Sequence, residues 1–147
     1  MSLYVITGPP ASGKSSWINA RAKPSDIVID LDRIALALAG PGAPQWQHDE
    51  TLLKVAHRAR FAAIDEAIQH RDRVDVYLIH TMPSAKALAR YHRLDAKVVA
   101  VDPGRDVVMQ RVRDMRHDGM LAVATRWYNQ QAKRGAHSVT RQSSRSW

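Results

Sequence analysis

A glycine-rich segment near the start of the chain has the residue types that hold phosphate groups. Its sequence is Gly8-Pro9-Pro10-Ala11-Ser12-Gly13-Lys14-Ser15, in which two glycines separated by four residues precede a lysine and a serine. Glycines let backbone N–H groups turn toward an anion, a lysine supplies a mobile positive charge, and a serine hydroxyl coordinates Mg²⁺. Average residue usage gives this pattern by chance in roughly half a percent of chains of this length.

This segment predicts a nucleotide-binding site. We expect Lys14 to contact the transferred phosphate as a catalytic residue and Ser15 to be a metal ligand. The structural alternative is a glycine-rich turn between a strand and a helix. The residues expected to hold the phosphates of ATP or another NTP are Gly8, Pro9, Pro10, Ala11, Ser12, Gly13, Lys14, Ser15 and Ser16.

Two carboxylates follow the apolar run at 27–29. Asp30 and Asp32 are separated by one residue, so an extended backbone would point both to the same side. We expect their strand to pair with or neighbour the strand before the glycine-rich segment. One carboxylate would then hold Mg²⁺ and the other would accept the proton of an attacking hydroxyl. We assign Asp30 to the metal and Asp32 to the base; the alternative is that Asp32 caps a helix over 33–39.

Three arginines lie on a helix expected over 106–116. Arg113 and Arg116 are three residues apart and share a face, whereas Arg111 lies about 160° around the helix from Arg113. Arg113 and Arg116 are therefore our candidates for cations that neutralise a transferring phosphoryl group. The alternative is a solvated basic helix paired with Asp106 and Asp114.

Other residues are candidates for binding a second substrate. Trp46, which leads into a predicted long helix, and His80, at the end of an apolar run, are assigned to substrate binding. A strand-end histidine with a backbone partner is the alternative for His80. Trp127 and Tyr128 would pack a terminal helix on a sheet, or with Arg126 would stack a nucleic-acid base.

Short apolar strands alternate with amphipathic helices along the chain, which predicts an α/β fold with a parallel sheet of four or five strands and helices on both faces. Ligands of such sheets bind beyond the carboxyl ends of the strands. We expect one domain over residues 1–135 and a basic, aperiodic tail over 136–147 that is mobile. The expected strands are 2–7, 27–29, 74–80 and 97–101, and the expected helices are 13–22, 33–39, 51–70, 83–92, 106–116 and 120–134.

Composition restricts the classes of function. The 147 residues include no cysteine, which excludes disulfides and thiolate metal sites and fits a cytoplasmic location. No signal peptide and no apolar run near the roughly 20 residues of a membrane span is present, so no membrane partner is expected. Residues 1–102 hold 13 Lys/Arg against 11 Asp/Glu, and residues 103–147 hold 9 against 3, within a formal net charge of +8. The basic final third favours a polyanionic partner such as nucleic acid; the sequence specifies no oligomeric state.

The first loop, in the form G-x-x-x-S-G-K-S-S-W, resembles that of the 5′-hydroxyl polynucleotide kinase domain of phage-type end-healing enzymes. The resemblance implies a nucleoside-monophosphate-kinase-like P-loop fold with an arginine lid over residues 1–134, with close similarity only near the two loops. That family has a D-x-x-R motif, matched by Asp30 and Arg33, in which the Asp is the general base and the Arg holds the acceptor phosphate. The D-x-D of shikimate-kinase-like enzymes is matched equally, by Asp30 and Asp32, and its second Asp faces the acceptor hydroxyl.

The chain departs from this family after the third strand. Kinases of this type usually carry a polar or acidic residue there, and this chain has Ile79-His80-Thr81-Met82. Mg²⁺ would then rest on Ser15, Asp30 and phosphates. The expected function is ATP- and Mg²⁺-dependent phosphoryl transfer to a polynucleotide 5′-hydroxyl or other nucleic-acid hydroxyl. The alternatives are a small-molecule kinase acting on a nucleoside, sugar or antibiotic, and a non-catalytic nucleotide-gated module that binds nucleic acid or protein.

Overall fold

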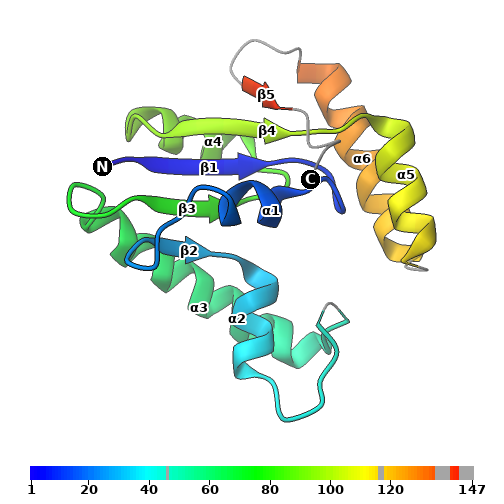
Figure 1. Cartoon of the computed structure of the whole chain (residues 1–147), viewed down its shortest axis with the longest axis horizontal. Coiled ribbons are helices and arrows are strands. Elements are labelled where there is room, and N and C mark those ends of the chain that lie inside the picture. Colours follow the sequence, from blue (N-terminus) through cyan, green and yellow to red (C-terminus); the bar gives the residue numbers. More distant parts are fainter. Residues whose placement is uncertain (46, 116–117, 135–139, 143–147) are drawn as a thin grey trace.

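A computed structural model describes residues 1–45, 47–115, 118–134 and 140–142. Five strands within these residues form one parallel sheet in the order β2-β3-β1-β4-β5 (Figure 1). The strands are β1 (Leu3–Thr7), β2 (Ile27–Ile29), β3 (Val76–Ile79), β4 (Lys97–Val101) and β5 (Thr140–Gln142). The helices are α1 (Lys14–Asn19), α2 (Leu31–Leu38), α3 (Glu50–Gln69), α4 (Ala85–Arg93), α5 (Arg105–Asp114) and α6 (Asp118–Arg134).

Helices cover both faces of the sheet, as predicted, because successive strand side chains alternate between two apolar cores. Leu3 and Val5 of β1 belong to a core with Ile64 of α3 and Tyr91 of α4. Ile6 faces the opposite side, where the core contains Trp17 and Ile18 of α1 and Tyr77 of β3. Helices α5 and α6 pack on each other beyond the end of β4 (Figure 1). The predicted α/β architecture with a parallel sheet is therefore confirmed.

Strand order differs from one prediction. We expected the strand that precedes Asp30 to pair with or neighbour β1, but β2 pairs with β3, and β3 lies between β2 and β1. That prediction is wrong because β3, the more completely buried strand, occupies a central position, whereas Ile27 and Val28 of β2 are only partly buried at an edge. The carboxyl ends of β1, β3 and β2 still lie along one edge of the sheet.

The backbone at the two carboxylates also differs from the prediction. Asp30 is the N-cap of α2, with an extended backbone at φ −138° and ψ 123°, and its Oδ1 accepts a hydrogen bond of 3.2 Å from the backbone N–H of Asp32. The expected extended run from 30 to 32 is wrong, and so is the alternative in which Asp32 caps the helix. The helix begins two residues earlier than predicted because the Asp30 carboxylate satisfies one of its free N–H groups.

Part of the C-terminal tail belongs to the sheet. β5 pairs in parallel with β4, with Val99 opposite Thr140 and Val101 opposite Gln142. The predicted absence of regular structure is therefore wrong for these three residues, because a strand can satisfy the backbone groups at the edge of β4. The rest of the tail lies outside the described residues.

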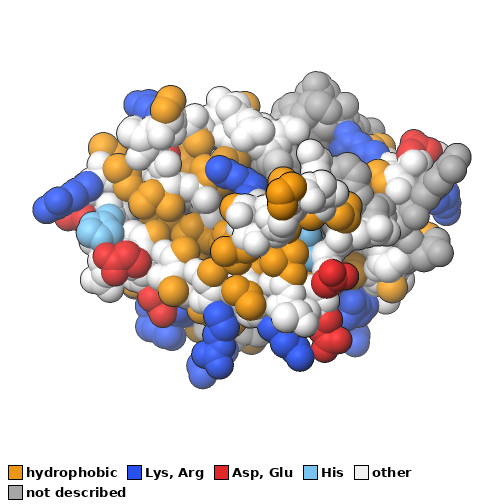
Figure 2. Space-filling view, turned by 90° about the horizontal axis from the view of Figure 1, so that it is seen from below, with side chains coloured by type: hydrophobic (Ala, Val, Ile, Leu, Met, Phe, Trp, Pro, Cys, Tyr) orange, Lys and Arg blue, Asp and Glu red, His pale blue; other side chains and the backbone are white. Residues whose placement is uncertain are grey.

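The face formed by α2 and α3 carries exposed apolar side chains. Leu36 and Leu38 of α2 and Val55 and Phe61 of α3 are 39–57% exposed. Viewed from below, the molecule has hydrophobic side chains over much of this side, with Lys and Arg mainly near its margins (Figure 2). None of the helices in the described part of the chain combines the length and apolar character that a bilayer crossing requires.

Candidate functional site

The glycine-rich loop, residues 8–13, joins β1 to α1 and has an unusual backbone. Ala11 has φ 59° although it is not a glycine, and Gly13 has φ 98° at the N-cap of α1. A left-handed backbone costs a non-glycine residue of order 1–3 kcal/mol and is kept where the surroundings impose it. Ala11 packs against the core of α5 and α6, and its carbonyl accepts a 3.0 Å hydrogen bond from Arg111 Nη1. Left-handed residues in such a loop form concave nests of N–H groups that bind anions.

Gly8 is fixed by the end of the neighbouring strand. Its φ is +147°, and a Cβ at this position would lie 2.3 Å from the carbonyl oxygen of Val101 and 2.8 Å from Ser12 Oγ. No side chain fits there without moving the backbone of β4. The first glycine of the motif therefore allows the loop to pack tightly against β4.

Lys14, the first residue of α1, folds back over the loop. Its Nζ donates hydrogen bonds of 3.0 Å to the carbonyl of Gly8 and 2.6 Å to that of Pro9. Burial lowers the pKa of Lys14 to about 8, and the negative charges of Asp30 and Asp32 act in the opposite direction. A bound anion would offset the same burial cost, because an opposite charge favours the protonated amine.

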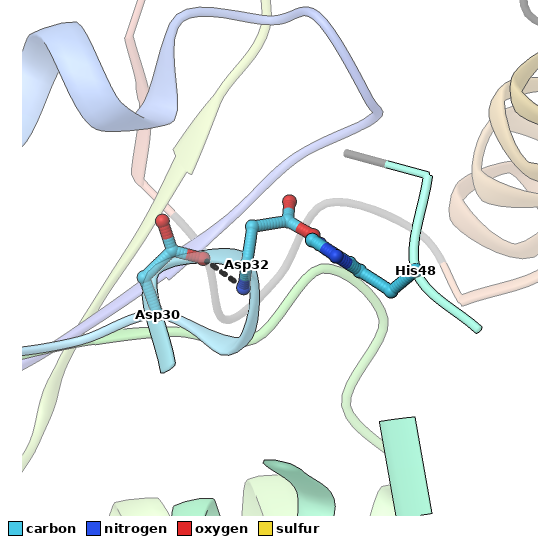
Figure 3. A network of polar contacts seen from close by, with 3 residues as sticks. All are labelled: Asp30, Asp32 and His48. Carbon is cyan, nitrogen blue, oxygen red and sulfur yellow. Dashed lines mark hydrogen bonds and ion pairs between the residues drawn. The ribbon is translucent and has the colours of Figure 1, made fainter. Parts of the chain in front are cut away.

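The two carboxylates differ in their surroundings (Figure 3). Burial raises the pKa of Asp30, the nearby charge of Asp32 raises it further, and its hydrogen bond with the Asp32 backbone and the charges of Lys14 and Arg33 oppose the rise. The Asp32 side chain is 61% exposed, and its Oδ1 lies 3.1 Å from Nε2 of His48, whose side chain is only 3% exposed. His48 was not among the predicted site residues; it follows a Gly/Pro-rich loop and lies sixteen residues after Asp32.

A pocket of about 840 Å³, the first pocket, brings most of the predicted residues together. The glycine-rich loop and α1 form one wall, the start of α2 forms another, and the end of β3 lies between them. Arg111 and Asp114 of α5 and Met120 of α6 add to the lining. Its members are residues 10–16, 30–32 and 79–82, with His57, Arg60, Arg111, Asp114, Met115 and Met120.

Arg60 of α3 is a second residue of the site that was not predicted from the sequence. It is 8% exposed, lines the first pocket, and donates a 3.0 Å hydrogen bond from Nη2 to the carbonyl of Ile79. Burial lowers its pKa, while Tyr91 and Asp30 act in the opposite direction. The sequence does contain a signal for Arg60. It lies four residues from Ala56 and four from Ile64, on the apolar face of the helix. An arginine at such a position needs a partner, because arginine is almost never buried alone.

His80 lies at the end of β3 and also lines the first pocket. Its Nδ1 is 2.7 Å from the hydroxyl of Tyr91, and its backbone N–H donates 3.0 Å to the carbonyl of Ile6. Burial, followed by the charge of Arg60, lowers the pKa of His80 to about 4, so the imidazole is neutral at pH 7. His80 is therefore a neutral polar group in the pocket, and the partner of its side chain is the Tyr91 hydroxyl instead of the backbone partner of the alternative interpretation.

The arginine prediction is corrected for Arg113 and stays a prediction for Arg116. Arg111, which we had set aside, reaches the glycine-rich loop and lines the first pocket. Arg113 is exposed and lies outside that lining, and Arg116 lies outside the described residues. The rotation of α5 decides this, because Val108 and Val112 are fully buried and Arg111 is turned toward the loop beside them. Since Arg111 and Arg113 lie about 160° apart, only one of them can face the pocket.

Three of the remaining candidates, Arg33, Trp127 and Tyr128, are not part of the lining of the first pocket. Arg33 is exposed on α2 and lines neither this pocket nor the one next to it, and Trp46 lies outside the described residues. Trp127 is fully buried and donates 3.0 Å from Nε1 to the carbonyl of Thr81. Tyr128 donates 2.7 Å to Asp102 Oδ1. The interpretation of Trp127 and Tyr128 as packing residues of the terminal helix is confirmed.

A second pocket, of about 1100 Å³, lies next to the first, between α2, α3 and the segment that joins them. Asp32 lines both pockets. The other lining residues are 38–40, 43, 44, 47–49, 51–53 and 55. The carboxylate of Asp32 therefore stands at the boundary between two spaces of ligand size.

Among the described residues, no group of three or more His, Asp or Glu side chains is placed to hold a metal ion by itself. Scanning the known protein families and searching the curated proteins both returned no match to this chain. Function is therefore inferred from the residues of the chain itself.

Proposed function

We propose that this chain is a P-loop phosphotransferase that moves the γ-phosphoryl group of ATP, or of another NTP, to a hydroxyl in the presence of Mg²⁺. One observation carries the proposal: residues 10–13 of the glycine-rich loop, Lys14 and the Asp30/Asp32 pair all line one pocket of about 840 Å³. The left-handed Ala11 and Gly13 suit a loop whose N–H groups bind phosphate oxygens. Lys14, now bonded to two loop carbonyls, would exchange them for phosphate oxygens.

The donor atoms beside the loop suit Mg²⁺. Ser15 offers a hydroxyl and Asp30 a carboxylate, both in the lining of the first pocket. Mg²⁺ prefers oxygen ligands and keeps several waters, so two protein ligands and the phosphates suffice. The cation would neutralise charge on the phosphates and would lower the pKa of Asp30, which burial now raises.

Asp32 is the candidate general base. The hydroxyl oxygen forms a bond to the γ-phosphorus, the bond from that phosphorus to the bridging oxygen breaks, and ADP leaves with the bonding electrons. The hydroxyl proton passes to the Asp32 carboxylate. The Asp32 side chain is 61% exposed although its Oδ1 contacts His48, so an acceptor can reach it. The partly buried Asp30 carboxylate bonds to the backbone at the start of α2, which favours Asp32 over the D-x-x-R alternative.

Cations around the pocket would stabilise the transferring group. Lys14, Arg60 and Arg111 line it from three different helices. In phosphoryl transfer, positioned cations supply much of the rate enhancement, because the protein does little covalent chemistry itself. In this proposal Arg60 and Arg111 would neutralise the transferring phosphoryl group in place of the exposed Arg113, and α5 and α6 would serve as the lid.

The acceptor has two candidate classes. The resemblance to polynucleotide kinases and the basic final third of the sequence favour a polynucleotide 5′-hydroxyl. The second pocket beside Asp32 favours a small molecule such as a nucleoside, sugar or antibiotic. A non-catalytic nucleotide-gated module is the alternative to both.

The test is a transfer assay with γ-labelled ATP and Mg²⁺, offering 5′-hydroxyl oligonucleotides, nucleosides and sugars in separate reactions. We expect label on a hydroxyl acceptor with the natural chain and none with Lys14→Ala. Nucleotide binding without transfer or hydrolysis in any reaction would favour the non-catalytic module. Equal ATP affinity in the natural chain and in folded Lys14→Ala would refute the proposal.

A further inference from the structure

We propose that the second pocket is the acceptor site, that it takes a phosphate-free polyol, a nucleoside or a sugar, and that His48 positions Asp32 for its hydroxyl. The inference rests on the proposed phosphoryl transfer and departs from the acceptor that the sequence resemblance implies.

Asp32 lies where the two pockets meet. Asp32 lines both pockets, and Lys14 lines only the one that contains the glycine-rich loop. A base that accepts a proton from the attacking hydroxyl must lie between the phosphoryl donor and the acceptor. If the nucleotide phosphates occupy the first pocket, the space on the other side of Asp32 is the second pocket.

His48 is buried beside Asp32. Its side chain is 3% exposed and lines the second pocket, and its Nε2 lies 3.1 Å from Oδ1 of Asp32 (Figure 3). Its Nδ1 is buried and has no hydrogen-bond partner among the described residues. A buried polar atom without a partner is costly, so the fold keeps the imidazole beside Asp32 against that cost. The bond through Nε2 holds one oxygen of an otherwise exposed carboxylate.

The two pockets differ in the charged side chains that line them. The first pocket balances its three carboxylates with three cations, Lys14, Arg60 and Arg111. Among the described residues that line the second pocket, the charged side chains are the two carboxylates of Asp32 and Asp49, and no lysine or arginine is present. A phosphate placed there would meet like charge, whereas a neutral or amine-bearing polyol would not.

The apolar part of the lining fits the same class of ligand. Leu38 and Val55 are 50% and 52% exposed, and both line the second pocket together with Leu52, Leu53 and Pro44. Apolar side chains bind the faces of sugar and base rings, while a few polar groups fix orientation. Gln47, His48 and Thr51 supply those polar groups.

In this arrangement His48 is a positioning residue. The acceptor hydroxyl forms the bond to the γ-phosphorus, its proton moves to the Asp32 oxygen that His48 leaves free, and ADP departs. The imidazole keeps the carboxylate directed to the boundary of the two pockets and exchanges no proton with the substrate.

The first experiment identifies the acceptor class. The full chain is incubated with γ-labelled ATP and Mg²⁺ and, separately, with adenosine, uridine, glucose, glucosamine or a 5′-hydroxyl oligonucleotide. We expect label on at least one phosphate-free compound and little on the oligonucleotide. Label mainly on the oligonucleotide, or ATP hydrolysis with no labelled compound, overturns the inference while leaving nucleotide chemistry intact. Failure to bind ATP refutes the proposed function itself.

The second experiment places an arginine in the second pocket. Thr51→Arg adds a cation to the lining, and Ala62→Arg adds the same side chain to an exposed position of α3 outside both pockets. We expect Thr51→Arg to raise the KM for the phosphate-free acceptor at least about threefold, with the Kd for ATP unchanged, and Ala62→Arg to change neither. An unchanged KM for the phosphate-free acceptor in folded Thr51→Arg, or an equal change in Ala62→Arg, would contradict the inference.

The third experiment separates positioning from structure. His48→Leu removes the bond to Asp32, whereas the amide nitrogen of His48→Gln can replace Nε2. By analogy with groups that orient a catalytic ligand, we expect His48→Leu to lower kcat about tenfold at constant KM for ATP, and His48→Gln to restore most of it. Equal kcat in the two variants, or a loss in His48→Leu that follows its thermal stability alone, would show that His48 has no positioning role.

Discussion

Substitution of Gly8 by alanine tests the tight packing on which the glycine-rich loop depends. The added Cβ would lie 2.3 Å from the Val101 carbonyl oxygen, more than 1 Å inside an ordinary contact of about 3.5 Å. Overpacking costs about 1–3 kcal/mol, and the φ of +147° costs an alanine about 1–3 kcal/mol more. We expect Gly8→Ala to lose about 2–6 kcal/mol of the free energy of unfolding, a large share of the roughly 5–15 kcal/mol of an ordinary domain.

Two glycines of the same chain separate the steric cost from the backbone cost. Gly42 has φ +84°, and nothing lies within 4 Å of the position that a Cβ would take, so Gly42→Ala should lose only the backbone cost of about 1 kcal/mol. Gly40 is equally open and lacks a positive φ of this kind, so Gly40→Ala should change stability little.

The assay is urea denaturation followed by tryptophan fluorescence, with ATP binding measured on the folded fraction. We expect stability to fall in the order Gly40→Ala, Gly42→Ala, Gly8→Ala, and nucleotide affinity to fall only for Gly8→Ala. If Gly8→Ala loses no more stability than Gly42→Ala, the close approach of the loop to β4 is not the constraint, and the reasoning fails.

Three further predictions concern charges in the first pocket. Lys14→Ala should weaken ATP binding by roughly 10- to 150-fold in calorimetry while the fold survives, since a charge-assisted hydrogen bond contributes about 1.5–3 kcal/mol; unchanged affinity would contradict the role of this amine. Asp32→Asn should lower the transfer rate by roughly 100-fold or more with little change in ATP affinity, and Asp30→Asn should weaken the Mg²⁺ dependence; a silent Asp32→Asn with an inactive Asp30→Asn would reverse the two roles. Folding lowers the pKa of His80 from 6.5 to about 4, so between these pH values the unfolded chain binds a proton that the folded chain does not. The contribution of neutral His80 to the free energy of unfolding is therefore complete above pH 6.5 and is lost as the pH falls toward 4. Denaturation midpoints of the natural chain and His80→Asn across this range should converge at low pH, and parallel curves would exclude His80 as the cause.

Local spacing determined much of the site from the sequence. The motif of residues 8–15 correctly located the turn between β1 and α1, because its glycines, lysine and serine act over a few residues of backbone. The apolar run 97–101 matched β4 residue for residue, and the alternation of strands and helices predicted the parallel sheet. Asp30 and Asp32 were found because they directly follow a short apolar strand.

The tertiary structure decided which distant side chains join that site. Sequence spacing showed that Arg111 and Arg113 face apart, but only the packing of Val108 and Val112 turned Arg111 toward the loop. Arg60 reaches the pocket because α3 buries one face against the sheet.

Strand order and the partner of Asp32 were also decided by the tertiary structure. The place of β3 between β2 and β1 follows from side-chain packing between segments tens of residues apart. His48 meets Asp32 because of the path of the chain between α2 and α3, which no local periodicity encodes. Backbone geometry within a motif depends on a few neighbouring residues, so residue types specify it. The rotation of a helix and the order of strands depend on the packing of the whole core, because they are the ones that give the folded chain its lowest free energy.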